Sequence, residues 1–324
     1  MITISACIIV KNEERVLERC LHSLQDLVDE IIIVDTGSTD RTKEIAKKYT
    51  NHVYDYEWND NFADARNVSF SYATMEYIYV ADADEVIDEE NRNKFLQMKQ
   101  TLLPEIEIVQ MYYANQKQYN TTYNFDMEYR PKLYRRLRTF HWISPLHESV
   151  RLEPVIWDSD IQILHMPEEN HGERDFRIYQ KVIKQEGSLS KKLTMLYARE
   201  LLIAGKERDM ITALPYFEML YHNTENEELF QYSECICAKA YHLLEREQDF
   251  WKVSLRHMAS GEPVSEICYE IGLYYEEKEE YEEAILWFDC AKHETNPILD
   301  LRTKEEFPNN HEIECRKKLS RKKE

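Results

Sequence analysis

The stretch Tyr77–Glu89, which reads YIYVADADEVIDE, determines how the rest of the chain is interpreted. It opens with the β-branched and aromatic run Tyr77–Ala81, a composition typical of a buried strand. Three carboxylates follow within four residues, where such a strand would enter a loop: Asp82, Asp84 and Glu85. Carboxylates this close repel one another, and a hard divalent cation such as Mg²⁺ or Mn²⁺ relieves the repulsion. The stretch therefore predicts a metal site, with a solvated acidic turn as the alternative.

Strand and helix patterns alternate ahead of this stretch. Dense β-branched runs predict strands over 3–10, 31–34 and 53–56, and helical spacing predicts helices over 41–49 and 63–73. Helical spacing also predicts a helix that carries Val16 or Leu17, Cys20, Leu21 and Leu24 on one face. After the stretch, further strands are predicted over 106–113 and 132–137. This alternation is typical of an α/β fold with a Rossmann-like, mostly parallel sheet. Ligands of such sheets bind beyond the carboxyl ends of the strands.

Polar residues stand at three of these predicted strand ends. Asn12 and Glu13 follow the first strand, Asp35 follows the second, and Asp82 and Asp84 follow the strand at Tyr77. Because the carboxyl ends of parallel strands meet at one edge of a sheet, we expect these side chains to line one site.

The sequence motifs limit the class of ligand that this site can bind. Neither G-x-G-x-x-G nor G-x-x-x-x-G-K-[ST] is present, which excludes the dinucleotide fingerprint and the P-loop. Asp35 can accept hydrogen bonds from a base imino group or from ribose hydroxyls. A metal at Asp84 and the cation of Arg66 are then available for a diphosphate.

Charge and composition limit the class of protein. The net charge of −20 makes general nucleic-acid binding unfavourable, since phosphate contacts need Lys and Arg. No apolar run approaches the roughly 20 residues that span a bilayer, and the N-terminus lacks the pattern of a signal peptide. The seven cysteines include no C-x-x-C pair and predict buried, reduced thiols. We therefore expect a cytoplasmic protein without a transmembrane segment.

Four segments, in this order and spacing, resemble the family 2 glycosyltransferases: ISACIIVKNEERVLERCLHSL (4–24), EIIIVDTGSTDRT (30–42), FADARN (62–67) and VADADE (80–85). The similarity is greatest to the branch that holds lipopolysaccharide-core glucosyltransferases and the S-glycosyltransferase of the peptide sublancin. It covers about residues 1–180. It implies a GT-A fold, a nucleotide-sugar donor that is most often a UDP-sugar, a divalent metal, and inversion at the anomeric carbon.

The resemblance also implies roles for individual residues. Asp35 would contact the uracil and ribose, Asp82 the ribose or the sugar, and Asp84 the metal. Thr36 is a departure, because many members carry a second aspartate there. The predicted donor-binding residues are Val10, Asn12, Glu13, Asp35, Arg66, Asp82 and Ala83.

The base that an inverting transfer requires is predicted in the segment 140–150, FHWISPLHESV. Glu148 is the predicted base, and the similar branch carries a His-Glu pair at this place. His147 is the alternative base, or a partner that orients Glu148. Each of the two, taken alone, is also consistent with a structural hydrogen bond.

A second metal ligand is predicted after the short strand 161–164. His165 follows this strand, and a neutral imidazole is a good ligand beside a carboxylate. In the resembled branch such a histidine completes the metal site with the D-x-D residues. The alternative is a histidine that caps the end of the strand.

The chain changes character at about Arg174, after which helical spacing predominates. Ala238 and Gly272 lie in similar segments 34 residues apart, and Ala284 and Phe288 extend the second copy in the tetratricopeptide pattern. We predict a glycosyltransferase domain over 1–185 and about three degenerate repeats over 190–320. A concave, tyrosine-rich face of such repeats is suited to a peptide or to a second copy of the chain in a homodimer.

These observations predict a metal-dependent inverting glycosyltransferase that uses Mn²⁺ or Mg²⁺ and a UDP-sugar. Helical repeats commonly hold extended peptides, which favours a Cys, Ser or Thr side chain of a peptide or protein as the acceptor. A cell-envelope oligosaccharide is the alternative acceptor. A repeat scaffold whose transferase domain is inactive is the alternative from another class.

Overall fold

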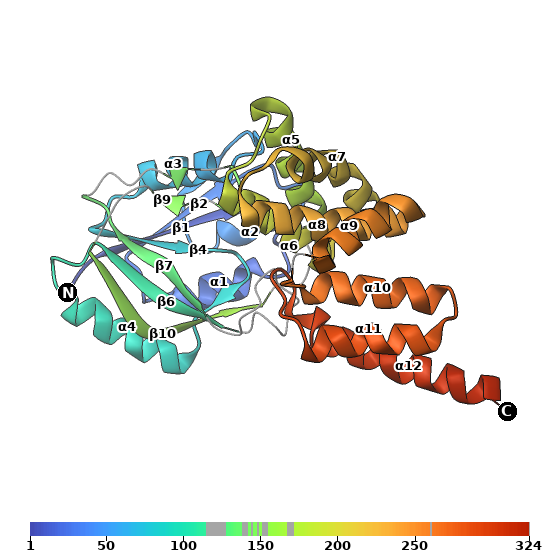
Figure 1. Ribbon diagram of the computed structural model, residues 1–324. Coiled ribbons are helices and arrows are strands. Elements are labelled where there is room, and N and C mark those ends of the chain that lie inside the picture. The colour runs from blue at the N-terminus through green and yellow to red at the C-terminus, as the bar shows by residue number, and fades with distance from the viewer. Residues whose placement is uncertain are drawn as a thin grey trace. The chain divides into compact units, whose positions relative to one another are not determined.

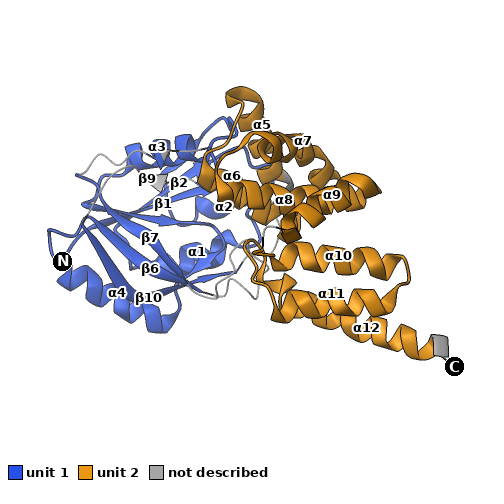
Figure 2. Cartoon of the chain, in the orientation of Figure 1, with its two compact units in different colours: residues 1–170 blue, residues 171–324 orange. Residues whose placement is uncertain are grey.

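The computed structural model describes residues 1–114, 128–137, 142–143, 145–147, 149–150, 155–166, 172–259 and 261–323 (Figure 1). The chain divides into two compact units, residues 1–170 and 171–324 (Figure 2). Helix α5 (Gly172–Glu186) belongs to the second unit, because it packs on helices α6 and α7 of that unit. The predicted transferase domain, residues 1–185, includes nearly all of this helix.

The first unit is built on one mixed, eight-stranded sheet with the strand order β3-β2-β1-β4-β7-β6-β10-β5. Strands β3, β2, β1 and β4 are parallel to one another, as are β6 and β10. Strand β7 is antiparallel to both β4 and β6, and β5 is antiparallel to β10. The predicted, mostly parallel α/β sheet is therefore confirmed. The strands are β1 (Ile4–Val10), β2 (Glu30–Asp35), β3 (Val53–Asp55), β4 (Tyr77–Ala81), β5 (Glu85–Val86), β6 (Ile108–Ala114), β7 (Glu128–Arg135) and β10 (Ile156–His165).

Four helices and a small second sheet complete the described part of this unit. The helices are α1 (Leu17–Leu24), α2 (Thr42–Ala46), α3 (Phe62–Tyr72) and α4 (Glu89–Thr101), and the small sheet pairs β8 (Trp142–Ile143) with β9 (Ser149–Val150). Helix α2 is shorter than the predicted 41–49, and β7 and β10 begin earlier than the strands predicted there.

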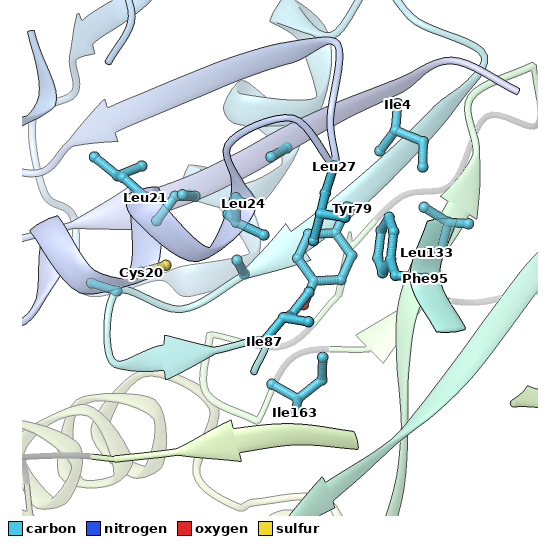
Figure 3. Packing of buried hydrophobic residues seen from close by; sticks show 14 of the residues in the cluster. Ile4, Cys20, Leu21, Leu24, Leu27, Tyr79, Ile87, Phe95, Leu133 and Ile163 are labelled. Atoms are coloured by element: carbon cyan, nitrogen blue, oxygen red, sulfur yellow. The ribbon is translucent and has the colours of Figure 1, made fainter. Parts of the chain in front are cut away.

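The core lies between the sheet and helices α1 and α4. Every residue of β4 is buried, because apolar side chains cover both of its faces. Tyr79 of β4 packs edge to face on Phe95 of α4, with ring centroids 5.5 Å apart (Figure 3). On α1 the predicted apolar face is buried, and the Cys20 thiol donates to the carbonyl oxygen of Asp82 at 3.4 Å. This packing anchors the acidic turn after β4.

The described part of the second unit is helical, as predicted. Its helices after α5 are α6 (Lys191–Ala204), α7 (Glu207–Asn223), α8 (Glu227–Leu243), α9 (Glu247–Ala259), α10 (Ser265–Glu277), α11 (Tyr281–His293), the short 3₁₀ helix η1 (Leu301–Thr303) and α12 (Glu306–Lys323). All seven cysteines of the chain are free thiols, and six of them are buried. None of the helices in the described ranges is both long and apolar enough to cross a membrane.

Gly272 allows α10 and α11 to approach closely. A Cβ atom at this position would overlap the ring of Phe288, which is fully buried together with Ala284 and Ala291. Gly272, Ala284 and Phe288, three of the positions that suggested a tetratricopeptide pattern, therefore lie at one helix–helix contact. The repeat assignment itself stays a prediction.

The Gly272→Ala variant is expected to lower the free energy of unfolding by about 1–3 kcal/mol, the usual effect of overpacking a dense contact. Thermal or urea unfolding of the full chain measures this. Glu283→Ala, on the exposed side of α11, is the matched control and is expected to change stability by less than about 0.5 kcal/mol. Equal stability of Gly272→Ala and the wild type would show that the two helices separate easily.

Candidate active site

The sheet brings two acidic segments to one edge. In the parallel ladders, Val10 at the end of β1 lies opposite Asp35 of β2, and Ile8 lies opposite Ala81 of β4. Strands β2 and β4 therefore flank β1, and their carboxyl ends are about 10 Å apart, two interstrand spacings. This rim is where a parallel sheet binds its ligand.

Hydrogen bonds join the loops that follow β1 and β2. The amide of Asn12 donates to Ser38 Oγ at 2.8 Å, and the amide of Thr39 donates to Asn12 Oδ1 at 2.8 Å. The amide of Glu13 donates to Thr42 Oγ1 at 2.7 Å. Asn12 has a φ of 57°, a left-handed conformation that asparagine tolerates better than most residues. Asn12 and Glu13, two of the predicted donor-binding residues, thus connect the loop after β1 to the loop after β2.

Asp35 is completely buried at the centre of this rim. Its Oδ1 accepts hydrogen bonds from the amides of Gly37 at 2.9 Å and Ser38 at 2.8 Å, and Lys43 Nζ lies 3.7 Å away. Its Oδ2 is buried without a partner among the described residues. A buried acceptor in this state is costly, so a donor group of a ligand would be favoured there. Thr36, the departure from the family pattern, donates its hydroxyl to the Val10 carbonyl at 3.2 Å.

Arg66 and Asp82 form an ion pair beside the acidic turn. Arg66 Nη2 lies 2.8 Å from Asp82 Oδ1, and its guanidinium stands over the Trp142 ring at 5.3 Å. Burial opposes ionisation of Asp82, but the positive charges of Arg66 and Lys132 hold the pKa of this carboxyl well below its usual range. Asp82 thus fixes the position of the Arg66 guanidinium. Ala83, between the two aspartates, is buried.

Asp84 and His165 are brought together from β4 and β10. His165 Nε2 lies 3.1 Å from Asp84 Oδ2, and both side chains are 17% exposed. Two ligands at 2.1 Å from one octahedral Mg²⁺, at a right angle to each other, would be about 3.0 Å apart. The amide of Met166 donates to the Asp84 carbonyl at 3.1 Å, which joins the turn to the end of β10. The pair therefore fits the predicted metal, as two neighbouring ligands.

The described residues supply only part of a coordination shell here. Among the described residues no three His, Cys, Asp or Glu side chains are grouped to hold a metal. Mg²⁺ in nucleotide sites is commonly held by one or two protein carboxylates together with substrate phosphates. The arrangement of Asp84 and His165 suits a cation that binds with a diphosphate.

Three further residues lie beside this pair, and two of them, Lys132 and Tyr113, were not predicted to belong to the site. Glu85 Oε1 accepts a hydrogen bond from Lys132 Nζ, and both side chains are buried. The Tyr113 ring lies 5.0 Å from the ring of His165 and 5.1 Å from Lys132 Nζ. Burial raises the pKa of Tyr113 well above its usual range, so the phenol stays neutral. In the sequence Lys132 belongs to a basic patch with Arg135, and only the sheet shows that it faces Glu85.

The segment of the predicted base is described in part. The Pro145 carbonyl accepts a hydrogen bond from the amide of Phe62 at 3.0 Å, which places this turn at the start of α3. Leu146 is buried, and His147 is half-buried with a φ of 46°. Glu148 lies outside the described residues.

The comparisons with known proteins find similarity to glycosyltransferases. The model of glycosyl transferase family 2 matches residues 5–151. The chain is 46% identical over 85 residues to a TPR repeat-containing protein of Synechococcus elongatus, a match that covers 26% of this chain and 21% of that protein. It is 40% identical over 102 residues to the SPbeta prophage-derived glycosyltransferase SunS of Bacillus subtilis, which covers 31% of this chain and 24% of SunS. These matches span about a quarter or less of each relative.

Two solved structures are similar at low sequence identity. Glucosyl-3-phosphoglycerate synthase from Mycobacterium tuberculosis, in complex with Mg²⁺ and UDP, is 17% identical, with a TM-score of 0.42 over 59% of this chain and 81% of that one. TarS from S. aureus is 14% identical, with a TM-score of 0.40 over 79% of this chain and 55% of that one.

The family match covers the strands and turns that carry the rim. It includes Asp35, Arg66, Asp82 and Asp84, and the two candidate bases. His165 lies beyond the matched range, and the sheet returns it to Asp84. The chain therefore contains a glycosyl transferase family 2 domain within its first unit.

Proposed function

We propose that this glycosyltransferase transfers a sugar from a UDP-sugar to a Cys, Ser or Thr side chain of a peptide or protein, with inversion and with a divalent metal. The observation that supports it most is the pairing of Asp84 with His165 at the rim that also carries the buried Asp35. The ends of β2 and β4 lie about 10 Å apart across β1, which would give the nucleoside and the diphosphate separate contacts.

The nucleoside end of the donor would occupy the rim at β2. Asp35 Oδ2 is the buried acceptor that a uracil imino group or a ribose hydroxyl would satisfy. Val10 ends the neighbouring strand β1, and Asn12 and Glu13 lie in the loop that follows it. Asp82, ionised beside Arg66, is an acceptor for hydroxyls of the ribose or of the sugar.

The diphosphate end would lie at Asp84 and His165, the residues that would hold Mn²⁺ or Mg²⁺. When bound, such a cation stabilises the negative charge of the departing diphosphate. Asp84 would supply a carboxylate oxygen and His165 an imidazole nitrogen, a donor set that suits Mn²⁺ as well as Mg²⁺.

The transfer itself would be one displacement. The acceptor oxygen or sulfur bonds to the anomeric carbon while the bond from that carbon to the UDP oxygen breaks, so UDP leaves with the bonding electrons. The acceptor proton passes to Glu148, or to His147 if that residue is the base. A single displacement inverts the anomeric carbon.

The peptide or protein acceptor is supported by the helical second unit and by the similarity to SunS. UDP release with Mn²⁺ and UDP-glucose, UDP-galactose or UDP-N-acetylglucosamine tests the donor. Parallel reactions with Cys-, Ser- or Thr-containing peptides and with envelope oligosaccharides test the acceptor. Turnover with the oligosaccharides but not with the peptides would show that the acceptor is an envelope oligosaccharide. No turnover with any donor, with or without acceptor, would leave a binding scaffold.

The Asp35→Asn variant is expected to weaken UDP binding by about 10- to 100-fold, because an amide nitrogen replaces one acceptor of a buried, charged hydrogen-bonding group. Isothermal titration with UDP measures this in the absence of metal. Asp55→Asn is the matched control, since Asp55 is exposed and also lies beside Lys43. Unchanged affinity of Asp35→Asn would remove Asp35 from the nucleoside contact.

A further inference from the structure

A buried ion pair lies directly beside the two residues assigned to the metal. Glu85 and Lys132 are 2% and 5% exposed, and Lys132 Nζ donates to Glu85 Oε1. A buried pair of this kind contributes little net stability, because desolvation of the two charges offsets their attraction. Net stabilisation of the fold therefore does not account for a buried ion pair at this position.

The pair is connected to both halves of the metal site through the backbone. Glu85 follows Asp84 in the chain and lies opposite His165 in the antiparallel ladder of β5 and β10. The amide of Glu85 donates to the Asp82 carbonyl at 3.1 Å, which closes the acidic turn. A shift of the Glu85 side chain would therefore move the turn and the end of β10 together.

Lys132 approaches the same place from another strand. It lies on β7, whose neighbouring residue Leu133 is opposite Tyr79 of β4 in the ladder at the centre of the sheet. Its ammonium group also lies 5.1 Å from the ring centre of Tyr113, the ring that contacts His165. One rigid strand thus supports the turn through Glu85 and the histidine through Tyr113.

The carboxylates of the acidic turn have different partners. Asp82 is paired with Arg66, and Glu85 is paired with Lys132. Asp84, between them, faces only His165 among the ion pairs of the described residues. The two cations thus neutralise the flanking carboxylates, and the charge of Asp84 remains for a ligand.

We propose that Glu85 and Lys132 are positioning residues, which hold the Asp84 turn against the end of β10 so that Asp84 and His165 keep the separation that one divalent cation requires. The proposal rests on the proposed function, since it assumes that this pair binds the metal. Loss of an outer residue that orients metal ligands typically weakens metal binding by about 10- to 100-fold.

The test is Mn²⁺ binding by the full chain with UDP present, followed by the electron paramagnetic resonance signal of free Mn²⁺. Lys132→Met is expected to raise the Kd for Mn²⁺ by about 10- to 100-fold, and Lys132→Arg to recover most of the affinity, because the cation returns. UDP binding without metal is expected to stay unchanged, since it depends on Asp35. The double variant Glu85→Gln/Lys132→Met leaves no unpaired buried charge, so it is expected to fold, and to show the same loss of Mn²⁺ affinity.

The matched control is Lys99→Met. Lys99 is also 5% exposed and pairs with Asp29 at 2.7 Å, but Asp29 precedes β2, at the end of the sheet away from the rim. This variant is expected to lose stability without losing Mn²⁺ affinity. Wild-type Mn²⁺ affinity in the double variant would overturn the positioning role alone. A wild-type chain that binds UDP but no Mn²⁺ would overturn the metal assignment and, with it, this proposal.

Discussion

The Asp84→Asn variant is expected to lose Mn²⁺-dependent UDP-sugar hydrolysis by about 10³-fold, since a metal contributes several kcal/mol to stabilising the charge of a leaving diphosphate. Asparagine preserves the size of the side chain and a polar contact with His165, 3.1 Å away, but removes the charge. The measurement is UDP release at saturating donor, together with Mn²⁺ affinity. UDP binding without metal is expected to persist, because Asp35 is untouched.

Asp26→Asn is the matched control for this variant. Asp26 is 81% exposed, its neighbour is Arg92 at 3.4 Å, and asparagine tolerates its φ of 65°. Its activity is expected to equal that of the wild type. If Asp84→Asn also retained wild-type activity and Mn²⁺ affinity, Asp84 would be no metal ligand, and the acidic turn would be structural.

The Glu148→Gln variant is expected to keep its affinity for UDP and Mn²⁺ but to transfer sugar about 10²- to 10⁴-fold more slowly, the usual contribution of a general base. A glutamine has nearly the same shape but takes no proton from the acceptor. Single-turnover transfer to a peptide, with donor binding measured in parallel, separates the chemical step from binding.

His147→Gln distinguishes the two candidates for the base. If Glu148 is the base and His147 orients it, the histidine variant is expected to lose less activity than Glu148→Gln. The reverse order would assign the base to His147. Near-normal transfer by both variants would show that neither residue deprotonates the acceptor.

Much of the first unit could be predicted because its signals are local. The apolar runs of β1, β2 and β4 are buried on both faces, and the helix that begins near Val16 was found from its apolar spacing. The length of β10 was missed, because its first three residues, Ile156–Asp158, are exposed and do not alternate between apolar and polar side chains. Three of the four family segments include predicted strand ends, whereas FADARN (62–67) lies at the start of α3.

The sequence predicted which residues belong to the candidate site, but only the sheet showed which of them lie next to one another. Asp84 and His165 are far apart in the chain, and a ladder of β5 with β10 sets them 3.1 Å apart. Arg66 was predicted for a diphosphate, but the fold also fixes it on Asp82. The role of Lys132 beside Glu85 had no local signal, since the two residues lie on different strands.

The sequence by itself determined the α/β class, the family and the acidic residues of the rim, because strand composition and the residues after each strand are local properties of the chain. The tertiary structure alone decided which carboxylate pairs with which cation, and that Asp84 is left to His165. The physical reason is that electrostatic partners act through space over a few ångströms, and only strand order and register bring such groups within that distance.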